Sequence, residues 1–149
     1  MKILLTGANG FIGKNLTHFL SKKANVEILS VNRGTPKKDL ETYVINADWI
    51  IHLAGINRPN EEKEFVEGNV GFTNQICQTL INSNQKTPII FASSIQADKT
   101  NPYGLSKRAA EDALKRFSSD YDSPIFICRL ANVFGKWSRP NYNSAVATL

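Results

Sequence analysis

Tyr103 and Lys107 are the pair of side chains whose types and spacing could carry out chemistry. A separation of four residues places both on one face of a helix. A lysine ammonium beside a phenol stabilises the phenolate and lowers the tyrosine pKa toward neutrality, so Tyr103 could give or take a proton at working pH. A serine at the end of the preceding strand, Ser93 or Ser94, could bind the same substrate oxygen. Tyr-x-x-x-Lys alone is common on surface helices, so its value depends on its surroundings.

A glycine-rich turn near the amino terminus could bind a phosphate. The segment Gly7-Ala8-Asn9-Gly10-Phe11-Ile12-Gly13 follows an apolar run and precedes a stretch with apolar residues at helical spacing. This arrangement directs backbone N–H groups and a helix N-terminus at a phosphate, and the glycines let the backbone approach it. The spacing is one residue longer than the G-x-G-x-x-G fingerprint. A tight turn without a ligand is the alternative, but a place in the first strand–helix unit favours a dinucleotide.

The end of the second expected strand, 26–32, indicates which dinucleotide. A domain that prefers NAD carries Asp or Glu about 20 residues past the glycines to hold the ribose 2′-hydroxyl. Here the position offers Asn32 and Arg33, and the next acid is Asp39. Because an arginine can pair with a 2′-phosphate, the sequence favours NADP. An ordinary solvent-exposed loop arginine is the alternative interpretation.

Alternating strands and helices must position these residues. We expect strands at 3–5, 26–32, 48–55, 88–94 and 124–130, and helices at 14–20, 37–46, 69–82 and 101–117. Short connections between them predict a Rossmann-type doubly wound parallel sheet. Asn101 is a good N-cap, with Pro102 at the first helical position. We expect inward-facing Leu40, Val44, Ile45 and Leu105, and a hydrogen-bonded core His52 that is neither a ligand nor a base.

Composition narrows the function class. The chain has 149 residues, 42% hydrophobic and 21% charged, as expected of one soluble domain. No apolar run has membrane-spanning length and no signal-peptide pattern opens the chain, so we expect a cytoplasmic protein. The two cysteines, Cys77 and Cys128, lack His partners at metal-ligand spacing, which predicts reduced, partly buried thiols and no metal site. A dispersed net charge of +5 argues against nucleic-acid binding, although it suits an anionic nucleotide.

The chain resembles the extended short-chain dehydrogenase/reductase family, also called the NAD-dependent epimerase/dehydratase family. Matching segments cover nearly the whole chain in the family's order: Thr6-Gly7-Ala8-Asn9-Gly10-Phe11-Ile12-Gly13, His52-Leu53-Ala54-Gly55, Asn69 opening the fourth helix, Ser93-Ser94, Tyr103-x-x-x-Lys107 and Arg129-x-x-Asn132-Val133-Phe134-Gly135. The resemblance implies an NAD(P)-dependent enzyme acting on a nucleotide-linked sugar.

The resemblance also implies residue roles. Tyr103 would be the acid/base, and Lys107 would hold the nicotinamide ribose and tune Tyr103. Ser94 would position the carbonyl, with Ser93 in its place if the strand register is off by one, and Asn69 would be the active-site asparagine. The implied cofactor contacts are Gly7, Asn9, Gly10, Phe11, Ile12, Gly13, Asn32, Arg33, Leu53, Ala54, Gly55, Tyr103 and Lys107. Position alone assigns the substrate contacts Asn57, Arg58, Asn132, Lys136, Arg139 and Tyr142.

Narrower motifs, at 55–59, 94–97, 101–104 and 134–144, resemble a reductase branch of the family. This branch implies NADPH-dependent reduction of the 4-keto group of a UDP-linked 2-acetamido-2,6-dideoxy-hexosulose, in capsular polysaccharide precursor synthesis (the UDP-N-acetyl-L-fucosamine pathway). The short route from the second strand to Asp48 has no room for another strand–helix unit, which suits this branch. Two alternatives stay open: a nucleotide-sugar epimerase or dehydratase with tightly bound NAD, and a truncated NADP-binding module without catalysis.

The sequence departs from the family at its end. The family continues after Gly135 with a substrate-binding subdomain, and this branch adds a cupin domain. We therefore expect 1–149 to be an NADP-binding domain truncated before that subdomain, with 131–149 as the start of the substrate-binding region. Apolar surface left exposed where further chain would pack would favour association as a homodimer.

Overall fold

The computed structural model describes residues 1–138, in which strands and helices alternate. The strands are β1 (Lys2–Thr6), β2 (Glu27–Val31), β3 (Trp49–His52), β4 (Ile89–Ser94) and β5 (Ile125–Leu130). The α-helices are α1 (Phe11–Leu20), α2 (Lys37–Asn46), α3 (Lys63–Phe65), α4 (Phe72–Asn82) and α5 (Pro102–Tyr121). A π-helical turn, η1 (Val66–Gly71), joins α3 to α4, and a 3-10 turn, η2 (Ile95–Asp98), follows β4.

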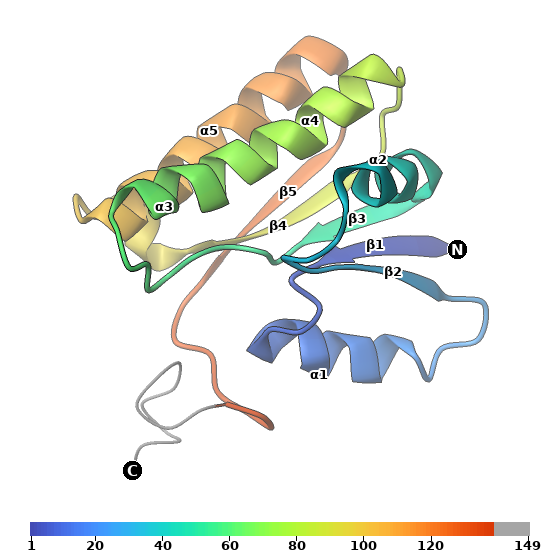
Figure 1. Cartoon of the computed structure of the whole chain (residues 1–149), viewed down its shortest axis with the longest axis horizontal. Helices are drawn as coiled ribbons and strands as arrows, with labels where there is room; N and C mark the ends of the chain where they lie inside the picture. Colours follow the sequence, from blue (N-terminus) through green and yellow to red (C-terminus); the bar gives the residue numbers. More distant parts are fainter. Residues whose placement is uncertain (139–149) are drawn as a thin grey trace.

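The strands form one parallel sheet in the order β2-β1-β3-β4-β5, which confirms the predicted doubly wound fold. The chain moves outward from β1 to β2, then returns to the other side of β1 with β3 and continues to β5 (Figure 1). In such sheets a ligand binds at the carboxyl ends of the strands, at the point where the order reverses. Here that point lies between β1 and β3.

Helices cover the two faces of the sheet unequally. In Figure 1, α1 lies on one face, and α2, α4 and α5 lie together on the other. The main core fills the second interface, where fully buried side chains come from both layers: Leu4, Val44, Ile50, Ile76, Leu80, Ile89, Phe91 and Leu114. Each such side chain contributes roughly 1.5–3 kcal/mol through removal from water. The carboxyl ends of the strands are therefore held by a rigid layer.

The α1 face of β3, β4 and β5 is open in the part of the chain that the structure describes. Ile51, Ile90 and Phe126 are neighbours across these strands and share that face by the period-two alternation of side chains. Trp49 joins them, with its ring 6.0 Å from that of Phe126, which is 51% exposed. This confirms the expected exposed apolar surface. Association with a second copy stays a prediction.

Several local predictions were wrong. Ile45 is 43% exposed because it lies about 100° around α2 from buried Val44, and Leu105 is 48% exposed because it lies on the side of α5 opposite buried Leu114. The third strand ends at His52 instead of continuing to Gly55, since the chain leaves the sheet there. Cys77 is buried as expected, whereas Cys128 is exposed on the open face of β5.

Asn101 and Pro102 begin α5 as predicted, with the Asn101 side chain accepting from Gly104 N.

His52 is a buried, hydrogen-bonded residue, as predicted. Its Nδ1 lies 2.8 Å from Thr6 Oγ1, and its Nε2 lies 3.0 Å from Thr73 Oγ1. The Thr73 hydroxyl donates to the Asn69 carbonyl, so it must accept from His52, which assigns the ring proton to Nε2. Nδ1 then accepts from Thr6, whose oxygen also accepts from Ala54 N. One continuous chain of hydrogen bonds therefore fixes the neutral ring.

A neutral His52 predicts a pH dependence of stability. Burial, helped by the charge of Lys107, lowers the pKa of His52 to about 3. Between pH 6.5 and about 3 the unfolded chain binds a proton that the folded chain does not, so stability falls as the pH falls. The expected loss by pH 4.5 is on the order of 2 kcal/mol. Urea unfolding at pH 7 and 4.5 should show a smaller difference for His52→Gln than for the parent chain. The exposed His18→Gln variant should retain the full difference, and equal losses in all three proteins would refute the assignment.

Candidate active site

A cleft of about 740 Å³ opens at the carboxyl ends of β1, β3, β4 and β5. It brings together most of the residues singled out in the sequence: Gly7, Gly10, Phe11, Ile12, Gly13, Leu53, Gly55, Asn57, Arg58, Ser93, Ser94, Tyr103, Lys107 and Asn132. The glycine turn and the Tyr103–Lys107 pair, almost 100 residues apart in the sequence, thus line one cavity.

The glycine turn is shaped to admit a phosphate. Gly7 has a φ of +70°, and its N–H donates to Val31 O at 2.9 Å, which ties the turn to β2. A Cβ on Gly13 would overlap the Gly7 carbonyl and Ala8, so this position accepts glycine alone. Gly10 is the N-cap of α1 and offers no side-chain hydrogen bond. The first N–H groups of α1 are therefore available to an anion in the cleft.

The end of β2 supports the glycine turn from outside the cleft. The Asn32 side chain accepts a hydrogen bond from Asn9 N at 3.1 Å. Arg33 follows in an exposed turn, and none of Asn9, Asn32 and Arg33 lines the cleft itself. The structure therefore gives Asn32 a clear role, as a brace for the turn. Arg33 lies one residue further along the same loop.

Lys107 reaches from α5 to the end of β4. Its ammonium donates to the Ala92 carbonyl at 2.7 Å and lies 4.1 Å from the centroid of the Phe91 ring. Burial lowers the pKa of Lys107 to about 8, while the carboxylate of Glu111 acts in the opposite direction. Lys107 is therefore fixed in direction and mostly protonated at neutral pH.

The acidity of Tyr103 differs from the sequence prediction. Its pKa is raised by burial, and the Ser94 side chain acts in the opposite direction. We predicted a pKa lowered toward neutrality by Lys107. That prediction was wrong for the protein alone, because burial dominates; the Lys107 ammonium itself is directed at Ala92 O. Tyr103 consequently stays protonated at neutral pH and can donate a proton. Ser93 and Ser94 also separate here: the Ser93 hydroxyl donates to Glu111, whereas Ser94 contacts the phenol.

Asn69 is a clamp in the wall of the cleft. Its Oδ1 accepts from Ile56 N at 2.8 Å, and its Nδ2 donates to Ile56 O at 3.0 Å and to Ser106 Oγ at 2.9 Å. Gly55 fits directly against it, since a Cβ there would lie 2.9 Å from Asn69 Oδ1 and 3.7 Å from Lys107 Nζ. Asn69 does not open the helix, as the sequence suggested, but lies inside the π-helical turn η1. It holds the loop after β3 against α5.

Some candidate residues lie elsewhere. Ala54 and Asn69 are not among the residues whose atoms line the cleft. Lys136, a predicted substrate contact, does not line the cleft, because its side chain lies over the Trp137 ring beside α1, 4.8 Å from the centroid. Arg139 and Tyr142 lie outside the described residues. Ile56 and Gln96 line the cleft although neither was proposed as a site residue, and their places in the motifs at 55–59 and 94–97 were the available signal.

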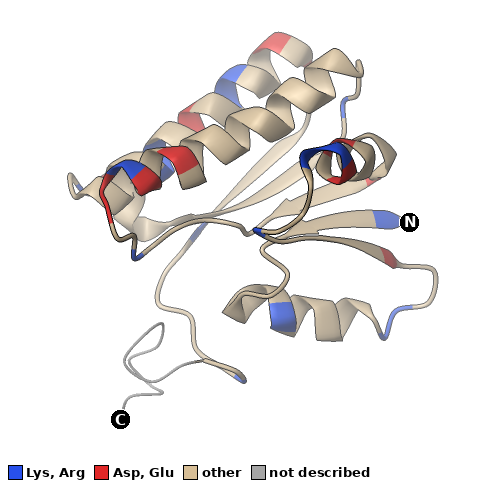
Figure 2. Cartoon of the chain, in the orientation of Figure 1, with Lys and Arg blue, Asp and Glu red and all other residues tan. Residues whose placement is uncertain are grey.

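Charge and composition within residues 1–138 add three observations. No group of three or more His, Cys, Asp or Glu side chains is placed to hold a metal ion, and no helix has the length and apolarity to span a membrane. Lys and Arg are spread over several helices and loops (Figure 2). The structure thus offers no single basic stripe in its described part.

Known proteins resemble the chain over almost its full length. The model of the NAD dependent epimerase/dehydratase family matches residues 3–149. A UDP-2-acetamido-2,6-beta-L-arabino-hexul-4-ose reductase from Pseudomonas aeruginosa is 47% identical over 148 residues, covering 99% of this chain and 40% of the relative. The crystal structure of the capsular polysaccharide assembling protein CapF from Staphylococcus aureus matches with a TM-score of 0.86 and 44% identity, over 99% of this chain and 40% of that one.

A more distant structure shares the fold. RMD from Pseudomonas aeruginosa, complexed with NADPH, matches with a TM-score of 0.82 at 20% identity, over 95% of this chain and 57% of that one. The chain spans 40% of the length of each of the two relatives above.

Proposed function

Because the chain belongs to the NAD dependent epimerase/dehydratase family, we propose that it is the cofactor-binding part of an NADPH-dependent reductase. Its substrate is the 4-keto group of a UDP-linked 2-acetamido-2,6-dideoxy sugar. The observation that carries the proposal is one cleft that joins a phosphate-shaped glycine turn to Ser94, Tyr103 and Lys107. The 47% identity to a reductase of such a sugar supports the substrate class.

The chain's own groups suit the proton half of a ketone reduction. NADPH, when bound, supplies a hydride to the carbonyl carbon. Tyr103 holds a proton at neutral pH, because burial raises its pKa, and gives it to the carbonyl oxygen to form the alcohol. Ser94, beside the phenol, donates a hydrogen bond to the same oxygen. The Lys107 ammonium stabilises the phenolate that remains after proton transfer.

The choice of NADPH over NADH rests on Arg33. No carboxylate follows β2 to hold a ribose 2′-hydroxyl, and Asn32 holds the β2 end against the glycine turn, so a nearby 2′-phosphate would lie within reach of Arg33. Arg33→Ala should weaken NADPH binding about 10- to 100-fold and leave NADH binding unchanged. Calorimetric titration of the 149-residue chain measures both, with Arg116→Ala, exposed on α5, as the control. Equal losses for the two cofactors would refute the role of Arg33.

The activity needs a substrate-binding half, which a chimera can supply. In the 47% identical Pseudomonas aeruginosa reductase, we would replace the matching part with residues 1–149 of this chain. Incubation with NADPH and a UDP-linked 4-keto sugar should remove NADPH absorbance in step with formation of the alcohol. An isomerised or dehydrated sugar without net loss of NADPH would instead establish the epimerase or dehydratase alternative. Binding of NADPH without any turnover would leave a cofactor-binding module.

A further inference from the structure

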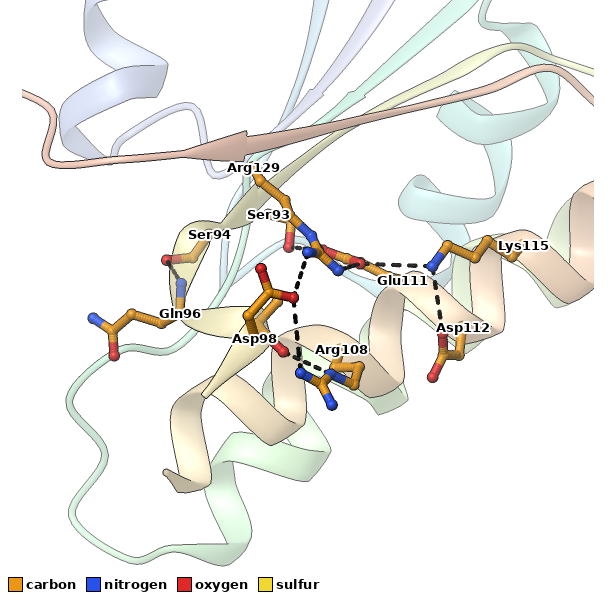
Figure 3. A network of polar contacts seen from close by, with 10 residues as sticks. Ser93, Ser94, Gln96, Asp98, Arg108, Glu111, Asp112, Lys115 and Arg129 are labelled. Carbon is orange, nitrogen blue, oxygen red and sulfur yellow. Dashed lines mark hydrogen bonds and ion pairs between the residues drawn. The ribbon is translucent and has the colours of Figure 1, made fainter. Parts of the chain in front are cut away.

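A network of four polar side chains lies beside the cleft, and Ser93 is the one among them that lines it. Arg129 on β5 forms a two-pronged pair with Glu111 on α5: Nε donates to Oε1 at 2.9 Å and Nη2 to Oε2 at 2.7 Å. Its third nitrogen donates to Asp98 of η2 at 2.6 Å. Ser93 of β4 donates to Glu111 Oε1 at 2.5 Å. Figure 3 shows Arg129 reaching down from β5 between the other three.

The network joins the four elements that position the proposed catalytic residues. Ser93 is adjacent to Ser94, so its bond to Glu111 ties the end of β4 to α5. Glu111 itself lies one helical turn beyond Lys107. Asp98 belongs to η2, and a Cβ on Gly104 would overlap the Gln96 carbonyl, so η2 rests directly on the first turn of α5, beside Tyr103. A shift of Arg129 would therefore be passed on to Ser94 on β4 and to Tyr103 and Lys107 on α5.

Stability alone does not account for such a network. An ion pair with a buried carboxylate contributes little net stability, because removing that charge from water offsets the attraction, and the Arg129 side chain is itself 35% exposed. Glu111 is 1% exposed. Burial alone would raise the pKa of Glu111, but hydrogen bonds from Arg129 and Ser93 and the charges of Arg129 and Lys115 hold that pKa below its usual value. The network therefore stabilises the charged form of a carboxylate that solvent scarcely reaches.

We propose that Glu111 and Arg129 are positioning residues for the reduction. Their ion pair fixes Ser94 against Tyr103 and Lys107, and it maintains a buried negative charge behind the Lys107 ammonium. The inference rests on the proposed function for its catalytic meaning, but its geometry and its charge can be tested without substrate.

The groups that face Lys107 come from several elements. On α5 these are Tyr103 and the Glu111 carboxylate, and on β4 the Ala92 carbonyl accepts a hydrogen bond from the Lys107 ammonium. From β3 comes His52, which is neutral above about pH 3. The loop after β3 and η1 contribute the uncharged Gly55 and Asn69. Arg129, Asp98 and Lys115 surround Glu111 from the far side. Glu111 thus supplies the carboxylate that most directly favours protonated Lys107.

The charge is tested in the 149-residue chain by nuclear magnetic resonance titration of Lys107. Glu111→Gln should lower the pKa of Lys107 by about one unit or more, since a neighbouring opposite charge is lost. The matched control is Asp112→Asn, which removes the next carboxylate on α5, one that is paired with the same Lys115 at 3.6 Å. That variant should leave the Lys107 pKa unchanged. An unchanged Lys107 pKa in Glu111→Gln would overturn the electrostatic role, whether or not the chain binds NADPH.

The geometry is tested with Arg129→Lys, which keeps the charge but cannot form the two-pronged pair. In the chimera it should lower kcat about 10- to 100-fold with little change in KM, because small misplacements of reacting groups cost that much. Arg116→Lys, outside the network on α5, serves as the control. Equal kcat values for the two variants would overturn the positioning role. A parent chimera without turnover would refute the proposed function instead, and the Lys107 titration would still decide the role of Glu111. If Glu111→Gln fails to fold, Arg129→Lys decides the proposal.

Discussion

Tyr103→Phe is expected to lower kcat for the ketone reduction by about 10²- to 10⁴-fold, the usual contribution of a positioned proton donor. The phenol lies in the cleft beside Ser94, and burial raises its pKa, so it is the protonated group available to the carbonyl oxygen. NADPH binding should be unaffected, because the glycine turn proposed to hold the phosphates lies on the α1 side of the cleft, away from the lost hydroxyl. The measurement is NADPH consumption by the chimera, paired with calorimetric titration of the 149-residue chain.

Tyr121→Phe is the matched control for this variant. Tyr121 lies on the same helix, stacks on Phe117 and is 43% exposed, far along α5 from the cleft. It should show parental turnover. A Tyr103→Phe chimera that keeps parental kcat would exclude Tyr103 as the proton donor and leave the reduction without an acid among the residues proposed here.

Gly13→Ala is expected to abolish NADPH binding. The added Cβ would overlap the backbone of Gly7 and Ala8, atoms that cannot rotate away as a side chain could. Relief requires the turn to open, which also costs roughly 1–3 kcal/mol of stability, as other overpacked sites do. Calorimetry should find no binding at NADPH concentrations that saturate the parent chain, and thermal unfolding should show a lower Tm.

Gly34→Ala separates this effect from the general loss of a glycine. A Cβ on Gly34 meets no atom within 4 Å. Both the melting temperature and NADPH binding of this variant should match those of the parent. Parental NADPH affinity in a folded Gly13→Ala chain would show that the glycine turn is not the phosphate site.

Local signals in the sequence were enough to predict most of the fold. The strand and helix order follows from apolar periodicity and from caps such as Asn101, whose side chain does accept from Gly104 N. The cleft could also be predicted, because parallel strands place their carboxyl ends at one edge of the sheet. Gly7 and Tyr103 meet in it for that reason, although the sequence separates them widely.

The properties that could not be predicted depend on long-range contacts. The pKa of Tyr103 is raised by burial, which depends on the folded surroundings, and the Lys107 ammonium is directed at the Ala92 carbonyl of another element. The exposure of Leu105 depends on which part of α5 meets the sheet. Arg129 opens the Arg129–Gly135 segment that matches the family. Its pairing with Glu111, however, could be predicted only by knowing that β5 packs on α5. The sequence did offer one signal for a role of Glu111, since its place four residues after Lys107 puts it one helical turn away on the same face.

The π-helical turn at 66–71 has a consequence for how this helix can vary in length. A π turn holds one more residue than an α turn, so it corresponds to an α-helix that has accepted a single-residue insertion. Deleting one residue there would restore a regular helix and preserve the packing of α4 beyond it. The same deletion would rotate everything before it by about 100°, turning the Asn69 amide away from Ile56 and Ser106. The extra residue therefore sets the orientation of Asn69, and a change in the length of this segment would remove the clamp.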